Sequence, residues 1–125
     1  MTHEEICTYE VAKLAKEKGF NEKCYHYYQN GALESDECFN RYNRGVDNVY
    51  SAPTQSLLQR WLREEKALHI QITLWDKGWY SDIWAFEYYE EEKEYYAKRL
   101  HQSPDLTSYE LALEDALKYA LENLV

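Results

Sequence analysis

Glycine and proline are scarce in this chain of 125 residues, with 4 and 2 copies respectively. Disordered and linker segments are usually rich in such residues, and no stretch of Gly, Pro or Ser divides this sequence. No internal repeat is visible. The sequence therefore predicts one folded domain over residues 1–125, long enough to bury about two thirds of its unfolded surface around one core.

Long apolar runs are also missing, since none approaches the roughly 18 residues that a membrane-spanning helix needs. Residues 1–5, MTHEE, lack the basic start and apolar stretch of a secretory signal. We therefore expect a soluble, cytoplasmic protein. The cysteines Cys7, Cys24 and Cys38 are odd in number, and in a reducing compartment we expect free thiols.

Positive charge is in deficit, with 14 Lys and Arg against 23 Asp and Glu and a net charge of −9. This balance opposes binding to DNA, RNA or anionic membranes, which all attract clustered Lys and Arg. The charge keeps an aromatic-rich chain soluble in one interpretation. In another, an acidic surface imitates nucleic acid and occupies a basic partner. The sequence leaves both open.

Aromatic residues, in contrast, are plentiful: the chain has 13 Tyr, 4 Trp and 3 Phe. Tyr and Trp combine a large apolar ring with a polar tip. They therefore suit half-buried surfaces and interfaces as well as cores.

Two segments in the first half have the apolar spacing of amphipathic helices. Residues 9–18 follow a capping Thr8 and end at Gly19, which readily adopts left-handed backbone. Residues 53–66 place Pro53 in the first turn, where a missing N–H costs nothing. The apolar faces consist of Val11, Leu14 and Ala15 in the first helix and of Leu57, Leu58, Trp61 and Leu62 in the second.

A third amphipathic helix is predicted over residues 107–123. Thr107 and Glu110 have the spacing of a capping box, in which each side chain satisfies a free backbone donor of the first turn. The apolar face of this helix consists of Leu113, Ala116, Leu117, Ala120, Leu121 and Leu124.

Residues 69–75 alternate in the way of a strand, and residues 79–89 return antiparallel after a turn at 76–78. One face carries Ile70, Ile72, Leu74, Ile83 and Ala85, and the other carries His69, Gln71, Thr73, Trp75, Trp84, Phe86 and Tyr88. Residues 90–102 are charged, and the spacing of Tyr95, Tyr96 and Leu100 predicts a helical turn or two there.

Residues 21–50 give weaker signals. Asn30-Gly31 is a hairpin turn signal, and Tyr27-Tyr28 before it suits the end of a strand. We expect irregular structure over residues 34–48, around one or two short strands. The whole pattern predicts an α+β fold: a small antiparallel sheet packed on one face by the helices 53–66 and 107–123, with a short N-terminal helix beside them.

Three segments carry a resemblance to a known group of proteins: VAKLAKEKGF (11–20), SAPTQSLLQRWLRE (51–64) and SYELALEDAL (108–117). Together they resemble small uncharacterised proteins encoded by gut bacteria and their phages or prophages. The middle segment is the most specific. The resemblance implies an accessory protein of mobile genetic elements, and it implies no activity and no catalytic residues.

Cys24, His26 and Cys38 form the only cluster with metal-ligand residue types. Zinc would require a fourth ligand, such as His69 or His101, and structural zinc sites usually contain two close pairs of ligands. The irregular spacing favours ordinary cysteines and histidines, so no metal or other cofactor is predicted. A small zinc domain or metal-dependent enzyme remains an alternative.

Catalytic groups are not evident elsewhere. None of the three cysteines has a local nucleophile signature, and His69 shares the polar face of its strand. The glutamates of the acidic run follow one another rather than converging from separate elements, which favours a solvated face over a cation site. They are Glu87, Glu90, Glu91, Glu92 and Glu94.

The predicted interaction surface is the aromatic face formed by Trp75, Trp84, Phe86 and Tyr88. Rigid aromatic side chains supply much of the energy of protein interfaces. In the alternative interpretation, residues 90–102 or 21–50 cover this face. Stacking of single-stranded bases would need flanking Lys and Arg, and only Lys77 is near.

These observations favour a non-enzymatic interaction protein of phage or prophage origin, acting on a host or phage protein through its aromatic or acidic surface. The metal-binding domain and the acidic nucleic-acid mimic are the alternatives. Self-association into a homo-oligomer is also open.

Overall fold

Helices and strands of an α+β fold account for most of residues 5–35 and 48–125, the part of the chain that the computed structural model describes. The strands form two antiparallel three-stranded sheets, ordered β2-β1-β3 and β4-β5-β6. In chain order the elements are α1 (Tyr9–Glu17), β1 (His26–Gln29), β2 (Ala32–Ser35), β3 (Val49–Ala52), α2 (Gln55–Lys66), β4 (His69–Trp75), β5 (Gly78–Tyr89), β6 (Glu94–Gln102) and α3 (Tyr109–Asn123).

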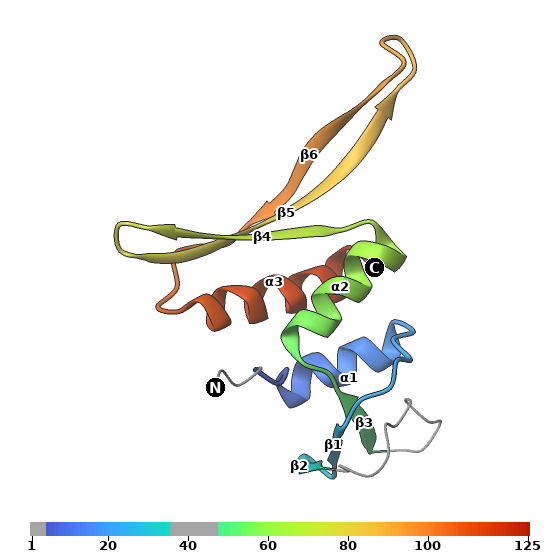
Figure 1. Cartoon of the computed structure of the whole chain (residues 1–125), viewed down its shortest axis with the longest axis vertical. Helices are drawn as coiled ribbons and strands as arrows, with labels where there is room; N and C mark the ends of the chain where they lie inside the picture. The colour runs from blue at the N-terminus through green and yellow to red at the C-terminus, as the bar shows by residue number, and fades with distance from the viewer. Residues whose placement is uncertain (1–4, 36–47) are drawn as a thin grey trace.

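The elements are stacked in layers, with α3 near the centre (Figure 1). The sheet β4-β5-β6 lies over α2 and α3, and α1 and the small sheet lie on the far side of these helices. The predicted packing of two amphipathic helices on one face of an antiparallel sheet is therefore confirmed.

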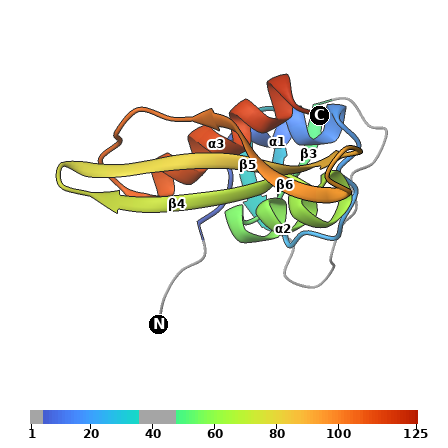
Figure 2. The same ribbon diagram turned by 90° about the horizontal axis from the view of Figure 1, so that it is seen from above.

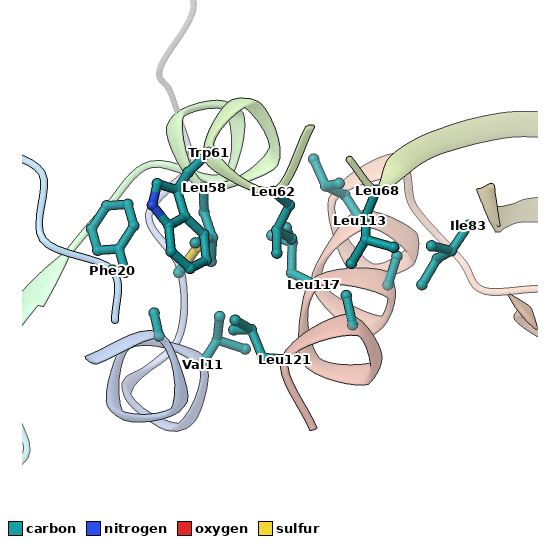
Figure 3. Packing of buried hydrophobic residues seen from close by; sticks show 14 of the residues in the cluster. Val11, Phe20, Leu58, Trp61, Leu62, Leu68, Ile83, Leu113, Leu117 and Leu121 are labelled. Atoms are coloured by element: carbon teal, nitrogen blue, oxygen red, sulfur yellow. The ribbon is translucent and has the colours of Figure 1, made fainter. Parts of the chain in front are cut away.

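The hydrophobic core joins the helices to the large sheet (Figure 3). Its fully buried side chains come from each layer: Val11 from α1, Leu58 and Leu62 from α2, Leu117 and Leu121 from α3, and Ile83 from β5. Ile70, Ile72 and Ala85 are partly buried against this core, as their alternation predicts. Leu74 belongs to the same face but is 63% exposed, because it pairs with Trp79 near the turn end of the β4-β5 hairpin.

Helix α1 begins where the sequence predicts and ends one residue earlier, at Glu17. The Thr8 hydroxyl accepts a hydrogen bond from the Val11 N–H at 3.3 Å. At the other end, Gly19 has a φ of +97°, and the Phe20 N–H donates to the Ala15 carbonyl at 2.9 Å. Phe20 is buried against the core and so seals the end of the helix.

Each of the other two helices starts two residues later than predicted. Pro53 precedes α2 rather than occupying its first turn, because Thr54 is the N-cap and accepts from the Leu57 N–H. Ser108, not Thr107, caps α3 and accepts from Leu111 N–H at 3.1 Å. In α3 two neighbouring residues, Thr107 and Ser108, could each cap the helix, and the structure uses Ser108.

The small sheet begins with the expected hairpin. Gln29 pairs with Ala32, and between them Asn30 and Gly31 have φ values of +52° and +83°, as a two-residue turn of this kind requires. Strand β3 adds to β1 on the other side, with His26 opposite Ala52. The sequence predicted irregular structure here and not a separate sheet. Most of the segment 34–48 lies outside the described residues.

The prediction of helical turns in residues 90–102 is wrong. Residues 94–102 form strand β6, which pairs with β5 from Asp82–Gln102 to Tyr89–Glu94. The charged residues favour a helix locally, but the cross-strand contacts of Tyr95 and Tyr96 with β5 decide the structure. In the described part of the chain, no helix has both the length and the apolar character that crossing a membrane requires.

Candidate interaction surface

The outer face of the large sheet is the side opposite α2 and α3. Because strand residues alternate, the predicted residues Trp75, Trp84, Phe86 and Tyr88 all belong to this face. Trp75 and Phe86 are each 61% exposed and Tyr88 is 43% exposed, while Trp84 is half-buried. The structure thus brings the four residues onto one surface.

No described element covers the outer face. Strand β6 lies beside β5 in the same sheet, and β1, β2 and β3 lie beyond the helices. Seen from above, β4, β5 and β6 lie over the helices with nothing across them (Figure 2). Neither segment that the sequence offered as a cover therefore performs that role in the described residues.

Strand β5 extends well beyond β4. The last β4-β5 pair is His69–Trp84, whereas β5-β6 pairing continues to Tyr89–Glu94. Residues 85–89 and 94–98, with the turn between them, form a two-stranded projection, which we call the distal ribbon. It rises away from the helices (Figure 1), and only Ala85 of its residues packs against the core.

Both faces of the distal ribbon are aromatic. On the outer face, the rings of Tyr88 and Tyr95 lie 4.9 Å apart between centroids. On the opposite face, Tyr89 and Tyr96 lie 5.3 Å apart in an edge-to-face arrangement. Sequence reasoning missed Tyr89, Tyr95 and Tyr96. The available signal was the symmetry of YYEEEKEYY (88–96), in which two aromatic pairs flank a polar turn.

A charged pair occupies the middle of the outer face. The Arg99 guanidinium lies 5.9 Å from the centre of the Trp84 ring, and its Nη1 lies 3.7 Å from Oδ1 of Asp82. Asp82 is only 6% exposed. The Trp84 Nε1 is buried and donates to no acceptor among the described residues. The face therefore already holds one cation between a ring and a carboxylate.

Two open hollows lie on either side of this centre. One, of about 370 Å³, is lined by His69, Ile70, Gln71, Trp84, Phe86 and Ala97. The other, of about 390 Å³, is lined by Trp75, Tyr80, Gln102, Ser103, Pro104 and Asp105. In the first, the rings of His69 and Phe86 meet edge to face at 5.7 Å. Its lining is mainly apolar, so it suits an apolar side chain.

Carboxylates dominate the charge of the distal ribbon. Glu87, Glu90, Glu91, Glu92 and Glu94 are all exposed, against two lysines, Lys93 and Lys98. Glu87 pairs with Lys98 at 3.5 Å. The phenol hydroxyls of Tyr89 and Tyr96 donate to Glu87 and Glu94 at 3.3 and 3.1 Å. Rings and carboxylates therefore alternate along the face of the ribbon opposite the outer face.

The proposed metal ligands are not brought together in the described residues. His26 begins β1, His69 lies on the outer face, and the His101 ring stacks on Tyr119 at 3.5 Å. Cys38 lies outside the described residues. Within residues 5–35 and 48–125, no group of three or more His, Cys, Asp or Glu side chains is arranged to hold a metal ion.

The described cysteines are buried free thiols. Burial, and then the nearby charge of Glu22, raises the pKa of Cys24 to about 12. Burial, followed by the charge of Glu114, also raises the pKa of Cys7 well above its ordinary value. A thiol that holds its proton at neutral pH is a poor nucleophile and a poor metal ligand.

Comparison with models of protein families, with curated proteins and with solved structures finds no match to this chain.

Proposed function

We propose that this chain is a non-enzymatic accessory protein that binds a positively charged surface of another protein through its outer face and distal ribbon. The resemblance of its three sequence segments to phage and prophage proteins makes a host or phage protein the proposed partner. The cytoplasm is the proposed compartment.

The observation that carries this proposal is the exposure of ordered aromatic rings on a ribbon that adds almost nothing to the core. Phe86 and Tyr88 lie on a sheet face that no described element covers. Exposed apolar surface of this extent usually marks a binding site. Tyr and Trp are also the residues that most often dominate binding energy once a partner excludes water from them.

The charge of the ribbon selects a basic partner. Its glutamates outnumber its lysines, so a cationic surface is attracted and a second acidic copy of the chain is repelled. Arginine side chains pair with carboxylates and also lie over aromatic rings. Arg99 of this chain makes both contacts, with Asp82 and Trp84.

The experiment is capture of partners by the full-length tagged chain and by a Trp75→Ala/Phe86→Ala double variant, followed by mass spectrometry. The matched control is Leu111→Ala, which removes an apolar side chain that is 52% exposed on α3, away from the outer face. We expect the double variant to lose the captured proteins and the control to keep them. Equal capture by both variants contradicts the proposal.

A series of Glu→Gln variants separates this function from imitation of nucleic acid. For an interface built on aromatic rings, replacing Glu90, Glu91 and Glu92 weakens binding and reduces its dependence on salt, but it does not abolish binding. For a nucleic-acid mimic, the same change removes binding, while the Trp75→Ala/Phe86→Ala variant retains it. The two results cannot be confused.

A further inference from the structure

Strand β5 has an open edge along the distal ribbon. It pairs with β4 up to Trp84 and with β6 from Asp82 to Tyr89, so residues 85–89 have a neighbour on one side only. On the other side, β4 begins only at His69. Before it, the chain leaves α2 through Ala67, which has a φ of +55°. The position in line with β4 is therefore unoccupied by any described residue.

The main-chain groups that face this edge can be identified from the bonds of β5. The Ser103 N–H donates to the Ser81 carbonyl at 2.9 Å, and the Lys93 N–H donates to the Tyr89 carbonyl at 2.8 Å. Ser81 and Tyr89, which are both odd-numbered residues of β5, therefore direct their main-chain groups toward β6. The one irregularity in the pairing leaves Leu100 as an extra residue on β6, so the alternation along β5 is unbroken.

Successive residues of a strand direct their N–H and C=O groups to opposite edges. The main-chain groups of Phe86 and Tyr88 consequently point to the open edge, where they have no strand partner. Unpaired edges of this kind accept a further strand, and natural proteins usually protect them.

The other two edges of the sheet are less suited to a new strand. On β4, the Gln59 side-chain amide donates to the Ile70 carbonyl at 3.1 Å and so occupies part of that edge. On β6, the bulge at Leu100 interrupts a regular ladder just beyond residues 94–98. The β5 edge has no extra residue of its own and ends beside the apolar hollow at His69, Trp84 and Phe86.

We propose that the partner adds an extended, basic segment as a fourth strand to the open β5 edge, beside Phe86 and Tyr88. This inference rests on the proposed function and specifies the form of the partner. Side chains of the added strand alternate between the two faces of the ribbon. On the outer face they lie beside Phe86 and the hollow at His69 and Trp84, which favours apolar residues. On the other face they lie beside Glu87, which favours Arg or Lys.

The resulting recognition pattern is an alternation of apolar and basic residues over the length of the open edge. Five residues of strand span about 17 Å. The charge argument again disfavours a second copy as occupant, because pairing this edge with itself would bring two Glu87 side chains, each paired with only one lysine, close together.

The test uses the full chain and a synthetic eight-residue peptide that alternates Val and Arg, with binding measured by calorimetry. Methylation of alternate peptide nitrogens blocks one edge of the added strand and spares the other. We expect methylation of one set to abolish binding and methylation of the other set to leave it nearly unchanged. Indifference to both sets, or absence of binding by the unmethylated peptide, overturns the proposal.

On the protein side, Tyr88→Pro is compared with Tyr88→Ala. Both changes remove the ring, but only proline removes the N–H that faces the open edge, and proline is tolerated at such edges. We expect Tyr88→Pro to bind the peptide about tenfold more weakly than Tyr88→Ala, the effect of one lost hydrogen bond with its partner left unpaired. Equal affinities overturn strand addition.

Two further measurements keep strand addition apart from the proposed function. If Tyr88→Pro and Tyr88→Ala bind the peptide equally while Trp75→Ala/Phe86→Ala still loses the captured proteins, strand addition is wrong and the interaction surface stands. A peptide with Glu in place of Arg that binds equally well overturns the basic occupant. The basic occupant is also overturned if the wild-type chain sediments as a dimer and the Tyr88→Pro variant sediments as a monomer.

Discussion

Side chains of one type have opposite roles in this protein, depending on the layer they occupy. Phe20 is buried beside Trp61, with the two rings 5.5 Å apart, whereas Phe86 and Trp75 are mostly exposed. Composition alone cannot separate the two groups. The separation comes from the faces of the strands and helices on which the residues lie.

The cost of truncation should follow this division. Leu117→Ala removes a fully buried side chain from the centre of α3, and we expect it to lower the free energy of unfolding by about 2–5 kcal/mol. Phe86→Ala should change it by no more than about 0.5 kcal/mol. Urea denaturation followed by circular dichroism compares the two, and a large loss for Phe86→Ala would show that the ring supports the fold.

The buried thiols should make the protein less stable in alkali. The pKa of Cys24 is raised from 9.0 to about 12, so the unfolded state loses this proton first. Its contribution to stability is complete below pH 9 and declines as the pH rises toward 12. We expect Cys24→Ala to flatten the fall in the free energy of unfolding over this range.

The measurement is urea denaturation at a series of pH values, with the slopes of the two proteins compared rather than their absolute stabilities. Each ionising thiol contributes about 1.4 kcal/mol per pH unit at most. Parallel curves for wild type and Cys24→Ala would contradict the assignment of the effect to this thiol.

At the scale of the element, local signals place the helices well and their first residues less well. The capping-box spacing with Glu110 favours Thr107, but Ser108 beside it is an equally good capping residue. Ser108 has extended backbone and accepts the Leu111 N–H. The choice is made by the docking of α3 between the sheet and the other helices.

We therefore expect Ser108→Ala to destabilise the protein by about 1 kcal/mol, the usual effect of losing an N-cap. Thr107→Ala is the matched control and should have almost no effect, because the Thr107 side chain is exposed and Ser108 caps the helix. Thermal unfolding of both variants decides this, and the reverse order would restore the capping box at Thr107.

Much of the fold could be predicted where one period of hydrophobicity dominates. Leu58, Trp61 and Leu62 recur at helical spacing, and Ile70 and Ile72 alternate, so their buried faces follow directly. Strand β6 could not be predicted in the same way. Its residues 94–98 have no buried face, and their conformation depends on pairing with residues of β5.

The candidate surface was predicted in part for the same reason. Alternation alone places Trp75, Trp84, Phe86 and Tyr88 on one face. Their exposure depends on what covers the sheet, which is a property of the tertiary structure. The symmetry of residues 88–96 draws attention to Tyr95 and Tyr96, but the face on which each ring lies follows only once residues 94–102 are known to be a strand.

For the whole molecule, the body and the distal ribbon are structurally separable. Ala85 and Lys98 are opposite each other at the base of the ribbon. Replacing residues 86–97 by Asn-Gly would close the hairpin there with a favoured two-residue turn. None of the residues removed belongs to the core cluster.

We expect this shortened protein to fold with a free energy of unfolding close to that of the wild type, because the residues removed lie outside the core cluster. It should lose the captured partners and the Val-Arg peptide together. Chemical denaturation and calorimetry measure the two properties. A shortened chain that folds and still binds would place the interaction elsewhere on the molecule.

The separation of ribbon from core also bears on how such a protein changes over generations. Substitutions in residues 86–97 change the contacts that the ribbon can make and have little effect on folding, because these residues lie outside the core. Under the proposed function, partner choice can therefore change by substitution at these dozen positions, while the side chains that form the core stay the same.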